Sequence, residues 1–448
     1  MPEAADTLRP ARFLGARNGL SGILQVPGDK SVSHRAVLLG AVNAGPVRIS
    51  GFLRSSDTLA SLRAVQSLGV QVDEQENNLV VRGKGWEGLR EPEDVIDVAN
   101  AGTLIRLLPG LLASTPHLCI LTGDDSIRRR PMARILEPLR AMGAQVAGRR
   151  NGTLPPIVVG GAALSGITYE LPIASAQVKS CIVLAGLRAT GRTEIIEPAA
   201  SRDHTERMVR FGGGQVERET LPNGRGRITV YPVEALHMDQ ISVPGDFSSA
   251  AFFIVAALLV PGSALTIENV GLNPSRTGLL EVLARMGAEI EVRLTDILGP
   301  EPIGTIRVVS SELRGTEVRP EEVPNVIDEL PLFLLAAAAA NGVSRLTGAA
   351  ELRAKESDRL AVMATFLRSL DVNVDEYPDG SQVSGKARWT KGHMDAHGDH
   401  RMAMTAAVAG LVSEHGVSVD DTGCIDVSFP GFTSLLESVG GTWSPEIP

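Results

Sequence analysis

The hydrophobic positions of the chain follow one pattern that returns six times. Each copy starts with a stretch that is apolar on almost every side, then turns into a short segment typical of a strand. A helix that is apolar all round is expected to be buried. These stretches are residues 33–45, 101–114, 175–191, 248–262, 328–342 and 399–416.

A second, amphipathic helix follows in each copy. In residues 55–72, for example, Leu59, Leu62, Val65 and Leu68 recur three positions apart, which predicts one apolar face that covers a core. Glycine commonly stops a helix, and a strand is expected after it. The six amphipathic helices are predicted to end near Gly69, Gly143, Gly213, Gly287, Asp371 and Gly440. The period of about 70 to 84 residues is longer than that of solenoid repeats.

The six copies divide into two groups of three. The motif Val-Pro-Gly-Asp begins at Val26 and again at Val243, each time just before an apolar stretch. We therefore predict an α/β protein with two pseudo-threefold domains, each built from three repeated α/β units.

Composition and charge exclude several classes of protein. A formal net charge of -9 over 448 residues argues against a nucleic-acid partner. No apolar run reaches the roughly 18 residues of a membrane helix, and the first residues lack the apolar centre of an export signal. Three cysteines without metal-ligand spacing, Cys119, Cys181 and Cys424, fit a reducing cytoplasm.

Polar clusters stand at the starts of the apolar helices, and basic residues stand in the loops before the amphipathic ones. Helix N-termini attract anions, and arginine suits phosphate and carboxylate groups. If both sets face one cleft, that cleft is basic inside an acidic protein. Taken singly, each arginine could equally be a solvated surface charge. The loop residues are Arg130, Arg202, Arg276, Lys355 and Arg359.

Two acids interrupt the basic set, Asp328 and Glu356. Carboxylates in different surroundings can serve as base and acid in one reaction. The alternative is that Glu356 and Asp358 are acids at a helix N-terminus, favoured by the helix dipole. For Asp358 we prefer this structural interpretation.

Eight segments carry a family resemblance. They read PGDKSVSHR, NAGT, RRPM, SAQVK, RDHTE, NPSRTG, RAKESDRL and GDHRMAM. Together they resemble the 3-phosphoshikimate 1-carboxyvinyltransferase family of aromatic amino acid and chorismate biosynthesis, over about residues 22–432. The resemblance implies the enolpyruvyl transferase fold, an inside-out α/β barrel. With it we expect residues 1–24 and 243–448 to form one discontinuous domain, residues 25–242 an inserted domain, and the active site to lie in the cleft between them.

The family resemblance implies an activity. The enolpyruvyl group of phosphoenolpyruvate is transferred to the 5-hydroxyl of 3-phosphoshikimate and phosphate is released, without a metal or organic cofactor. The enzyme would be a cytoplasmic monomer whose partners are these two small molecules, with no nucleic acid and no membrane.

The resemblance also implies a role for each site residue. Lys30, Asp328 and Glu356 would be catalytic and manage the protons. The phosphoenolpyruvate-binding residues would be Lys30, Asn100, Gly102, Arg130, Gln177, Lys355, Arg359 and Arg401, with His400 in support. The 3-phosphoshikimate-binding residues would be Ser31, Arg35, Ser175, Ala176, Gln177, Ser201, Arg202, Asp328 and Lys355.

The chain departs from the common family pattern at several positions. Val427 stands where many members have a lysine that reaches the phosphoenolpyruvate pocket, and Ala176 replaces a second serine. The segments SAQVK and RDHTE resemble the subgroup whose members often tolerate glyphosate, an inhibitor that occupies the phosphoenolpyruvate site in the family. That subgroup usually has Asn-x-Thr-Arg, whereas Ser275 precedes Arg276 here.

Two alternative functions remain. The first is an enolpyruvyl transferase that acts on UDP-N-acetylglucosamine; its loop cysteine would fall where Asp125 stands, and Cys119 is interpreted as a buried strand residue. The second is a non-catalytic sensor of phosphorylated metabolites, which would not need Lys30, Asp328 and Glu356 together.

Overall fold

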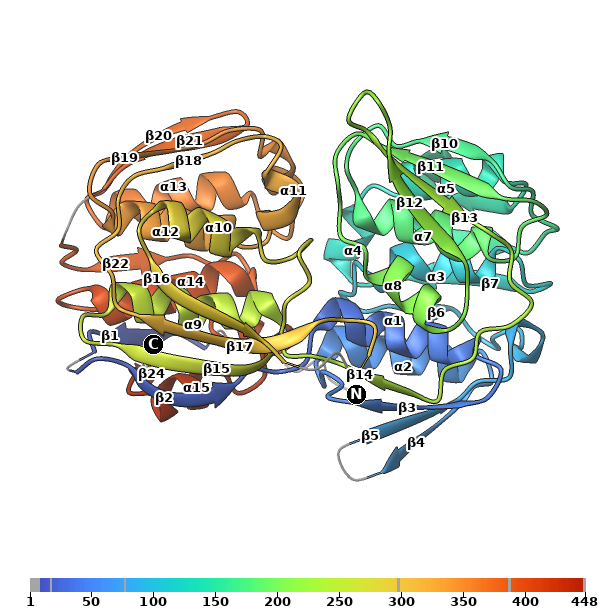
Figure 1. Ribbon diagram of the computed structural model, residues 1–448, viewed down its shortest axis with the longest axis horizontal. Helices are drawn as coiled ribbons and strands as arrows, with labels where there is room; N and C mark the ends of the chain where they lie inside the picture. Colours follow the sequence, from blue (N-terminus) through green and yellow to red (C-terminus); the bar gives the residue numbers. More distant parts are fainter. Residues whose placement is uncertain (1–8, 17, 76–77, 296–298, 386–387, 446–448) are drawn as a thin grey trace. The chain divides into compact units, whose positions relative to one another are not determined.

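The chain folds into two compact units. The structure is a computed structural model that describes residues 9–16, 18–75, 78–295, 299–385 and 388–445. Unit 1 comprises Met1–Pro27, Gly245–Asp296 and Ile303–Pro448, and unit 2 comprises Gly28–Pro244 and Ile297–Pro302. Figure 1 labels the elements of each unit in the colours of the sequence.

Within the described residues, the strands of unit 2 form three four-stranded sheets. Their orders are β14-β3-β5-β4, β6-β7-β9-β8 and β10-β11-β13-β12. The strands are β3 (Pro46–Ser50), β4 (Gln71–Gln75), β5 (Asn78–Arg82), β6 (Ile96–Asp97), β7 (Leu118–Thr122), β8 (Gln145–Gly148), β9 (Leu154–Gly160), β10 (Thr168–Glu170), β11 (Thr193–Glu197), β12 (Val216–Thr220), β13 (Gly226–Val230) and β14 (Gln240–Ser242). The helices are α1 (Lys30–Ala41), α2 (Ser56–Ser67), α3 (Leu104–Leu112), α4 (Asp125–Arg129), α5 (Ala133–Ala141), α6 (Arg149–Gly152), α7 (Ala176–Gly186) and α8 (His204–Phe211), with the 3-10 turn η1 (Trp86–Gly88).

Unit 1 repeats this plan in its described residues. The sheet orders are β16-β17-β15-β2, β18-β19-β21-β20 and β22-β23-β1-β24. The strands are β1 (Ala11–Leu14), β2 (Ser21–Gln25), β15 (Ala264–Gly271), β16 (Glu289–Leu294), β17 (Ile303–Val309), β18 (Glu317–Val318), β19 (Val343–Leu346), β20 (Asn373–Tyr377), β21 (Gly380–Ser384), β22 (Gly392–Met394), β23 (Val417–Val419) and β24 (Thr442–Pro445). The helices are α9 (Phe247–Leu259), α10 (Gly278–Arg285), α11 (Val323–Val326), α12 (Leu330–Ala339), α13 (Arg359–Ser369), α14 (His400–Val412) and α15 (Phe432–Ser438), with η2 (Ala350–Ala354) and η3 (Gly423–Val427).

All six sheets have the same topology. A short edge strand pairs in parallel with the strand after the buried helix, and the other two pairings are antiparallel, as in β6-β7-β9-β8. The first strands of the chain, β1 and β2, pair with β23, β24 and β15 far along the sequence. The predicted α/β fold of three repeated units in each half is therefore confirmed.

The apolar helices occupy the interior of each unit, as predicted. Nearly every residue of α9, α12 and α14 is buried, and these three helices contact one another. In unit 2, α1, α3 and α7 are buried in the same way. The sheets cover them from outside, so the centre of each unit is helical (Figure 1).

The predicted ends of the amphipathic helices are confirmed at all six positions. Each helix is followed by a residue with positive φ: Gly69, Gly143, Gly213, Gly287, Asp371 and Gly440. Glycine reaches this left-handed conformation without strain, and aspartate tolerates it better than most residues. The return strands, such as β5 and β9, were not predicted from the sequence.

The helices of the described residues are too short or too polar to cross a membrane.

Candidate active site

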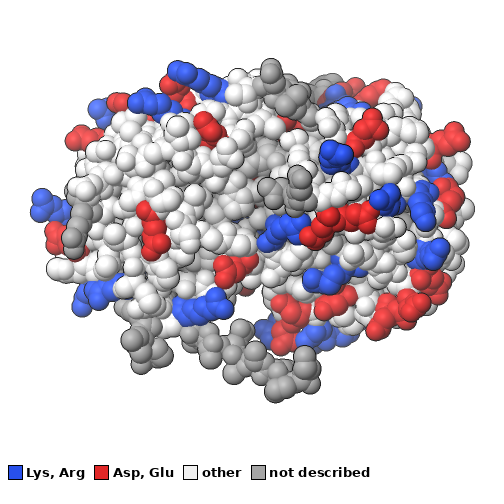
Figure 2. Space-filling view, turned by 90° about the horizontal axis from the view of Figure 1, so that it is seen from below, with Lys and Arg blue, Asp and Glu red and all other residues white. Residues whose placement is uncertain are grey.

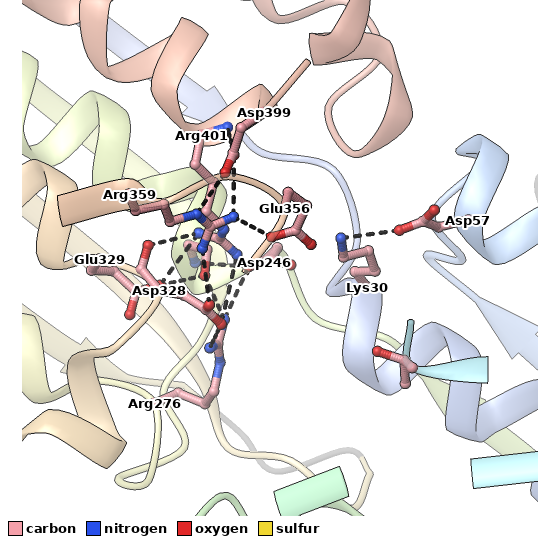
Figure 3. A network of polar contacts seen from close by, with 12 residues as sticks. Lys30, Asp57, Asp246, Arg276, Asp328, Glu329, Glu356, Arg359, Asp399 and Arg401 are labelled. Atoms are coloured by element: carbon pink, nitrogen blue, oxygen red, sulfur yellow. Dashed lines mark hydrogen bonds and ion pairs between the residues drawn. The ribbon is translucent and has the colours of Figure 1, made fainter. Parts of the chain in front are cut away.

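The first group of site residues in unit 2 lies where α1 and α2 begin. The Asp29 carboxylate accepts a hydrogen bond from the Val32 amide at 2.8 Å and so caps α1. Lys30, the first residue of this helix, points its ammonium group to Asp57 at 3.2 Å (Figure 3). Asp57 is buried near the start of α2, and its pairing with Lys30 was not predicted.

Arg35 lies deeper in α1 and is buried. Its guanidinium donates to Thr205 Oγ1 at 2.7 Å, to Ser180 Oγ at 2.9 Å and to the Ser31 carbonyl at 3.0 Å. Burial lowers the pKa of Arg35 to about 10, and the charge of Arg202 contributes in the same direction. The predicted residues Ser31, Arg35 and Arg202 therefore lie near one another.

Four predicted residues meet at the start of α3. The Arg130 guanidinium donates to Asn100 Oδ1 at 3.3 Å. A methyl group added to Gly102 would lie 2.4 Å from Arg130 Nη1, so this glycine allows Arg130 to approach. Gln177, from the start of α7, accepts a hydrogen bond from Arg106 at 2.7 Å. Arg106 is buried and was not identified from the sequence, although an arginine within an otherwise apolar helix is the signal that could have found it.

The start of α7 and the loop before α8 are joined by a buried charge cluster. Ser175 caps α7, and the next residue, Ala176, begins it. The Lys179 ammonium lies 3.2 Å from Glu197, 2.8 Å from Glu206 and 3.1 Å from the Ser201 carbonyl oxygen. The Ser201 hydroxyl donates to the Glu197 carboxylate at 2.8 Å. Lys179 thus binds the carbonyl oxygen of Ser201, and Glu197 binds its hydroxyl group.

Asp328 is the centre of the site residues in unit 1 (Figure 3). Its carboxylate oxygens lie 3.7 Å from Arg276, 3.6 Å from Arg359 and 3.8 Å from Arg401. Arg401 also donates to the Asp328 carbonyl at 3.1 Å. Three guanidinium groups thus surround one carboxylate.

Glu356 belongs to the same network. Arg359 donates to Glu356 at 2.7 Å and to both oxygens of Asp399 at 2.8 and 3.1 Å. Burial alone would lower the pKa of Arg359, but the negative charges of Asp399, Glu356 and Asp328 outweigh the effect of burial and raise the pKa. Burial also lowers the pKa of the half-buried Lys355, against the attraction of Asp328. Ion pairs therefore join five predicted residues of unit 1: Arg276, Asp328, Glu356, Arg359 and Arg401.

The capping residues of unit 1 complete this network. Asp399 accepts from the Arg401 amide at 3.0 Å and so caps α14, whose first residue is the buried His400. Asp246, from the second Val-Pro-Gly-Asp, caps α9 and lies 3.4 Å from Arg276. Asp358 caps α13, which confirms the structural interpretation of this acid.

Other features of the described residues bear on cofactors and partners. These residues form no group of three or more His, Cys, Asp or Glu side chains suited to a metal ion. Acidic and basic side chains are interspersed on the face drawn in Figure 2.

Cys119 is buried in β7, and burial raises the pKa of its thiol to about 11, as expected for a packing residue.

Comparisons with known proteins identify the family of this chain. The model of the family described as EPSP synthase (3-phosphoshikimate 1-carboxyvinyltransferase) matches residues 15–436. The chain belongs to the EPSP synthase family. It is therefore an enzyme, a transferase. The 3-phosphoshikimate 1-carboxyvinyltransferase of Desulforudis audaxviator is 49% identical over 94% of this chain and 97% of its own length. That of Halorhodospira halophila is 49% identical over 94% of each chain.

Solved structures show the same fold. EPSP synthase from Acinetobacter baumannii superposes with a TM-score of 0.87 at 40% identity, over 98% of this chain and all of its own. The enolpyruvyl transferase NikO from Streptomyces tendae reaches 0.77 at 17% identity, over 98% of this chain and all of its own, and shows the fold alone. The predicted enolpyruvyl transferase fold is thus confirmed.

The Lys179 cluster of this EPSP synthase family member yields a stability prediction. Lys179→Met should lower the free energy of unfolding by about 3–5 kcal/mol, because the buried Glu206 would lose its ion pair with Lys179 and the buried Glu197 would keep only its pair with Arg218. Arg192→Met is the control: Arg192 pairs with Glu194 at 3.1 Å but is 64% exposed, and such pairs contribute about 0–1 kcal/mol. Urea unfolding of both variants measures the difference, and equal losses would contradict the role of the cluster.

Proposed function

We propose that this chain transfers the enolpyruvyl group of phosphoenolpyruvate to the 5-hydroxyl of 3-phosphoshikimate and releases phosphate. The observation that carries the proposal is the network of unit 1, where Asp328 lies among the guanidinium groups of Arg276, Arg359 and Arg401, and Glu356 pairs with Arg359. Carboxylates that exchange protons and cations that bind anions are the two requirements of this reaction.

The addition step of the reaction needs two proton transfers, and the elimination step needs a third. The 5-hydroxyl oxygen attacks C2 of phosphoenolpyruvate and gives up its proton, while C3 gains one and becomes a methyl group. The tetrahedral intermediate then loses phosphate and a methyl proton, which restores the double bond. We assign Asp328 to the proton of the hydroxyl, Glu356 to the methylene carbon, and Lys30 to the support of both steps.

The remaining residues hold the substrates. We assign the binding of the phosphate and carboxylate of phosphoenolpyruvate to a set of cations and amides, with His400 in support. That set is Lys30, Asn100, Gly102, Arg130, Gln177, Lys355, Arg359 and Arg401. We assign 3-phosphoshikimate to Ser31, Arg35, Ser175, Ala176, Gln177, Ser201, Arg202, Asp328 and Lys355. We thus assign residues of both units to one pair of substrates.

The finer features of the proposal rest on particular residues. Ala176 and the loop at Arg202 support membership of the subgroup that often tolerates glyphosate. The three free and buried thiols fit a cytoplasmic enzyme. On the family resemblance we expect a monomer without a cofactor.

Acceptor specificity tests the function directly. Purified protein should release phosphate from phosphoenolpyruvate when 3-phosphoshikimate is present and should not do so with UDP-N-acetylglucosamine. A colorimetric phosphate assay with each acceptor, and with neither, measures this. Turnover only with the nucleotide sugar would reverse the assignment, and binding without turnover would favour a sensor.

The acid pair should be essential for turnover. Asp328→Asn and Glu356→Gln should each lower kcat by about 100-fold or more, because general acid–base groups contribute that much. Both variants should still bind 3-phosphoshikimate in calorimetry. Glu322→Gln, which alters an acid that pairs with Arg285 in the same unit, is the matched control and should keep its turnover. Near-normal turnover in either acid variant would remove that residue from the mechanism.

Gly102 should control the fit of anions beside Arg130. In Gly102→Ala the new methyl group must displace the Arg130 guanidinium, and the longer glyphosate has less room for this shift than phosphoenolpyruvate. We expect glyphosate binding to weaken by about 1–3 kcal/mol, and phosphoenolpyruvate binding to weaken less. Inhibition and Michaelis constants measure both effects, with Gly45→Ala, where a methyl group meets open space, as control. Equal weakening of both ligands would contradict the placement of Gly102.

A further inference from the structure

Arg353 occupies a special place in unit 1. It lies in η2, two residues before Lys355, and no role was assigned to it above. Its guanidinium donates to both carboxylate oxygens of Asp358, at 3.0 and 2.8 Å. Both hydrogen bonds come from one nitrogen, Nη1, so the other two guanidinium nitrogens can serve acceptors elsewhere.

The same guanidinium also holds the β20–β21 hairpin. It donates to Glu376 Oε1 at 2.8 Å, to the Tyr377 carbonyl at 2.8 Å and to the Pro378 carbonyl at 2.9 Å. All three guanidinium nitrogens of Arg353 therefore donate. The hydrogen bonds that Arg353 donates to the carboxylates of Glu376 and Asp358 raise its pKa, although burial opposes this.

The turn of this hairpin is bonded to the chain a second time. The Asp379 carboxylate accepts from the Gly348 amide at 3.0 Å, and the Asp379 carbonyl accepts from the Ala349 amide at 2.7 Å. The tip of the hairpin thus accepts hydrogen bonds both from the segment before η2 and from the guanidinium of Arg353.

These contacts close a short loop around two site residues. The Arg353–Asp358 pair joins the two ends of the segment 353–358, which carries Lys355 and Glu356 between them. Asp358 also accepts from the Ala361 amide at 3.1 Å, so the far end of the loop is fixed to the start of α13. The backbone that presents Lys355 and Glu356 is therefore held at both ends.

We propose that Arg353 is a positioning residue that orients Lys355 and Glu356 by clamping their loop to the β20–β21 hairpin. Arg353 acts through the loop and does not contact the reacting atoms. The proposal rests on the function proposed above, because it assigns Lys355 to substrate binding and Glu356 to proton transfer. We expect Arg353 to affect the geometry of the loop rather than the free energy of unfolding, because exposed ion pairs contribute little to global stability.

Kinetics of Arg353→Gln test this role. We expect kcat/KM for phosphoenolpyruvate to fall by about 10- to 100-fold, since a shift of about 1 Å in a catalytic group has effects of this size. The fall should include a lower kcat and a higher KM for phosphoenolpyruvate, whereas the KM for 3-phosphoshikimate should change less. Arg353→Lys should recover part of the activity, because lysine can pair with Asp358 but cannot also reach three acceptors of the hairpin.

Arg368→Gln is the matched control. Arg368 lies in α13 and is exposed, and it donates one hydrogen bond to the same hairpin, to the Val374 carbonyl at 3.0 Å. This variant should keep the kinetics of the unaltered enzyme. Urea unfolding should place both variants close to the unaltered protein, so that a loss of folded enzyme does not explain the kinetics.

Backbone hydrogen exchange separates failure of the clamp from failure of the function. Compared with the unaltered protein, peptides that cover residues 353–358 should exchange faster in Arg353→Gln and at the same rate in Arg368→Gln. Unchanged exchange, or faster exchange with unchanged kinetics, overturns the proposal. If the unaltered protein has no activity with phosphoenolpyruvate and 3-phosphoshikimate, the proposed function fails, while the exchange result still decides whether Arg353 holds the loop.

Discussion

Burial of three apolar helices in the centre of each unit is the constraint on which the rest of the structure depends. A helix without a polar face has no side from which water can reach its backbone, so its free amide groups must find partners in the protein. Asp29, Ser175, Asp246 and Asp399 supply these partners at the starts of α1, α7, α9 and α14. Polar chemistry is consequently concentrated at the helix N-termini, where anions are also favoured.

The two Val-Pro-Gly-Asp copies show how one backbone solution serves two purposes. Asp29 and Asp246 cap their helices in the same way, by accepting a backbone hydrogen bond from the first turn. After Asp29 comes Lys30, whose ammonium group pairs with Asp57. After Asp246 comes Phe247, which is buried. Asp246 itself forms an ion pair with Arg276. The repeated motif provides the helix start, and the residue after it decides whether that start carries a cation.

Local pattern and long-range contact explain which features could be predicted. The buried helices, the six helix ends and the cap at Asp358 depend on neighbours in sequence, and the pattern predicted them. Partners that are distant in sequence could not be found in this way: Arg106 meets Gln177, and Lys179 meets Glu197 and Glu206, only after the units fold. Arg353 was overlooked for the same reason, because its acceptors lie at the tip of a hairpin that follows helix α13 in the sequence.

Asp399 illustrates how these buried charges connect fold and chemistry. Burial alone would raise its pKa, but the Arg359 guanidinium holds the pKa below the ordinary value. The same carboxylate caps α14, accepts two hydrogen bonds from Arg359 and accepts one from Ser357. Arg359 is thereby fixed in a single orientation from which it reaches Glu356 and Asp328. Groups held in this way need little rearrangement when a charge develops nearby, which is the most effective form of electrostatic catalysis. The start of α14 and the carboxylates of Asp328 and Glu356 are therefore connected through Arg359.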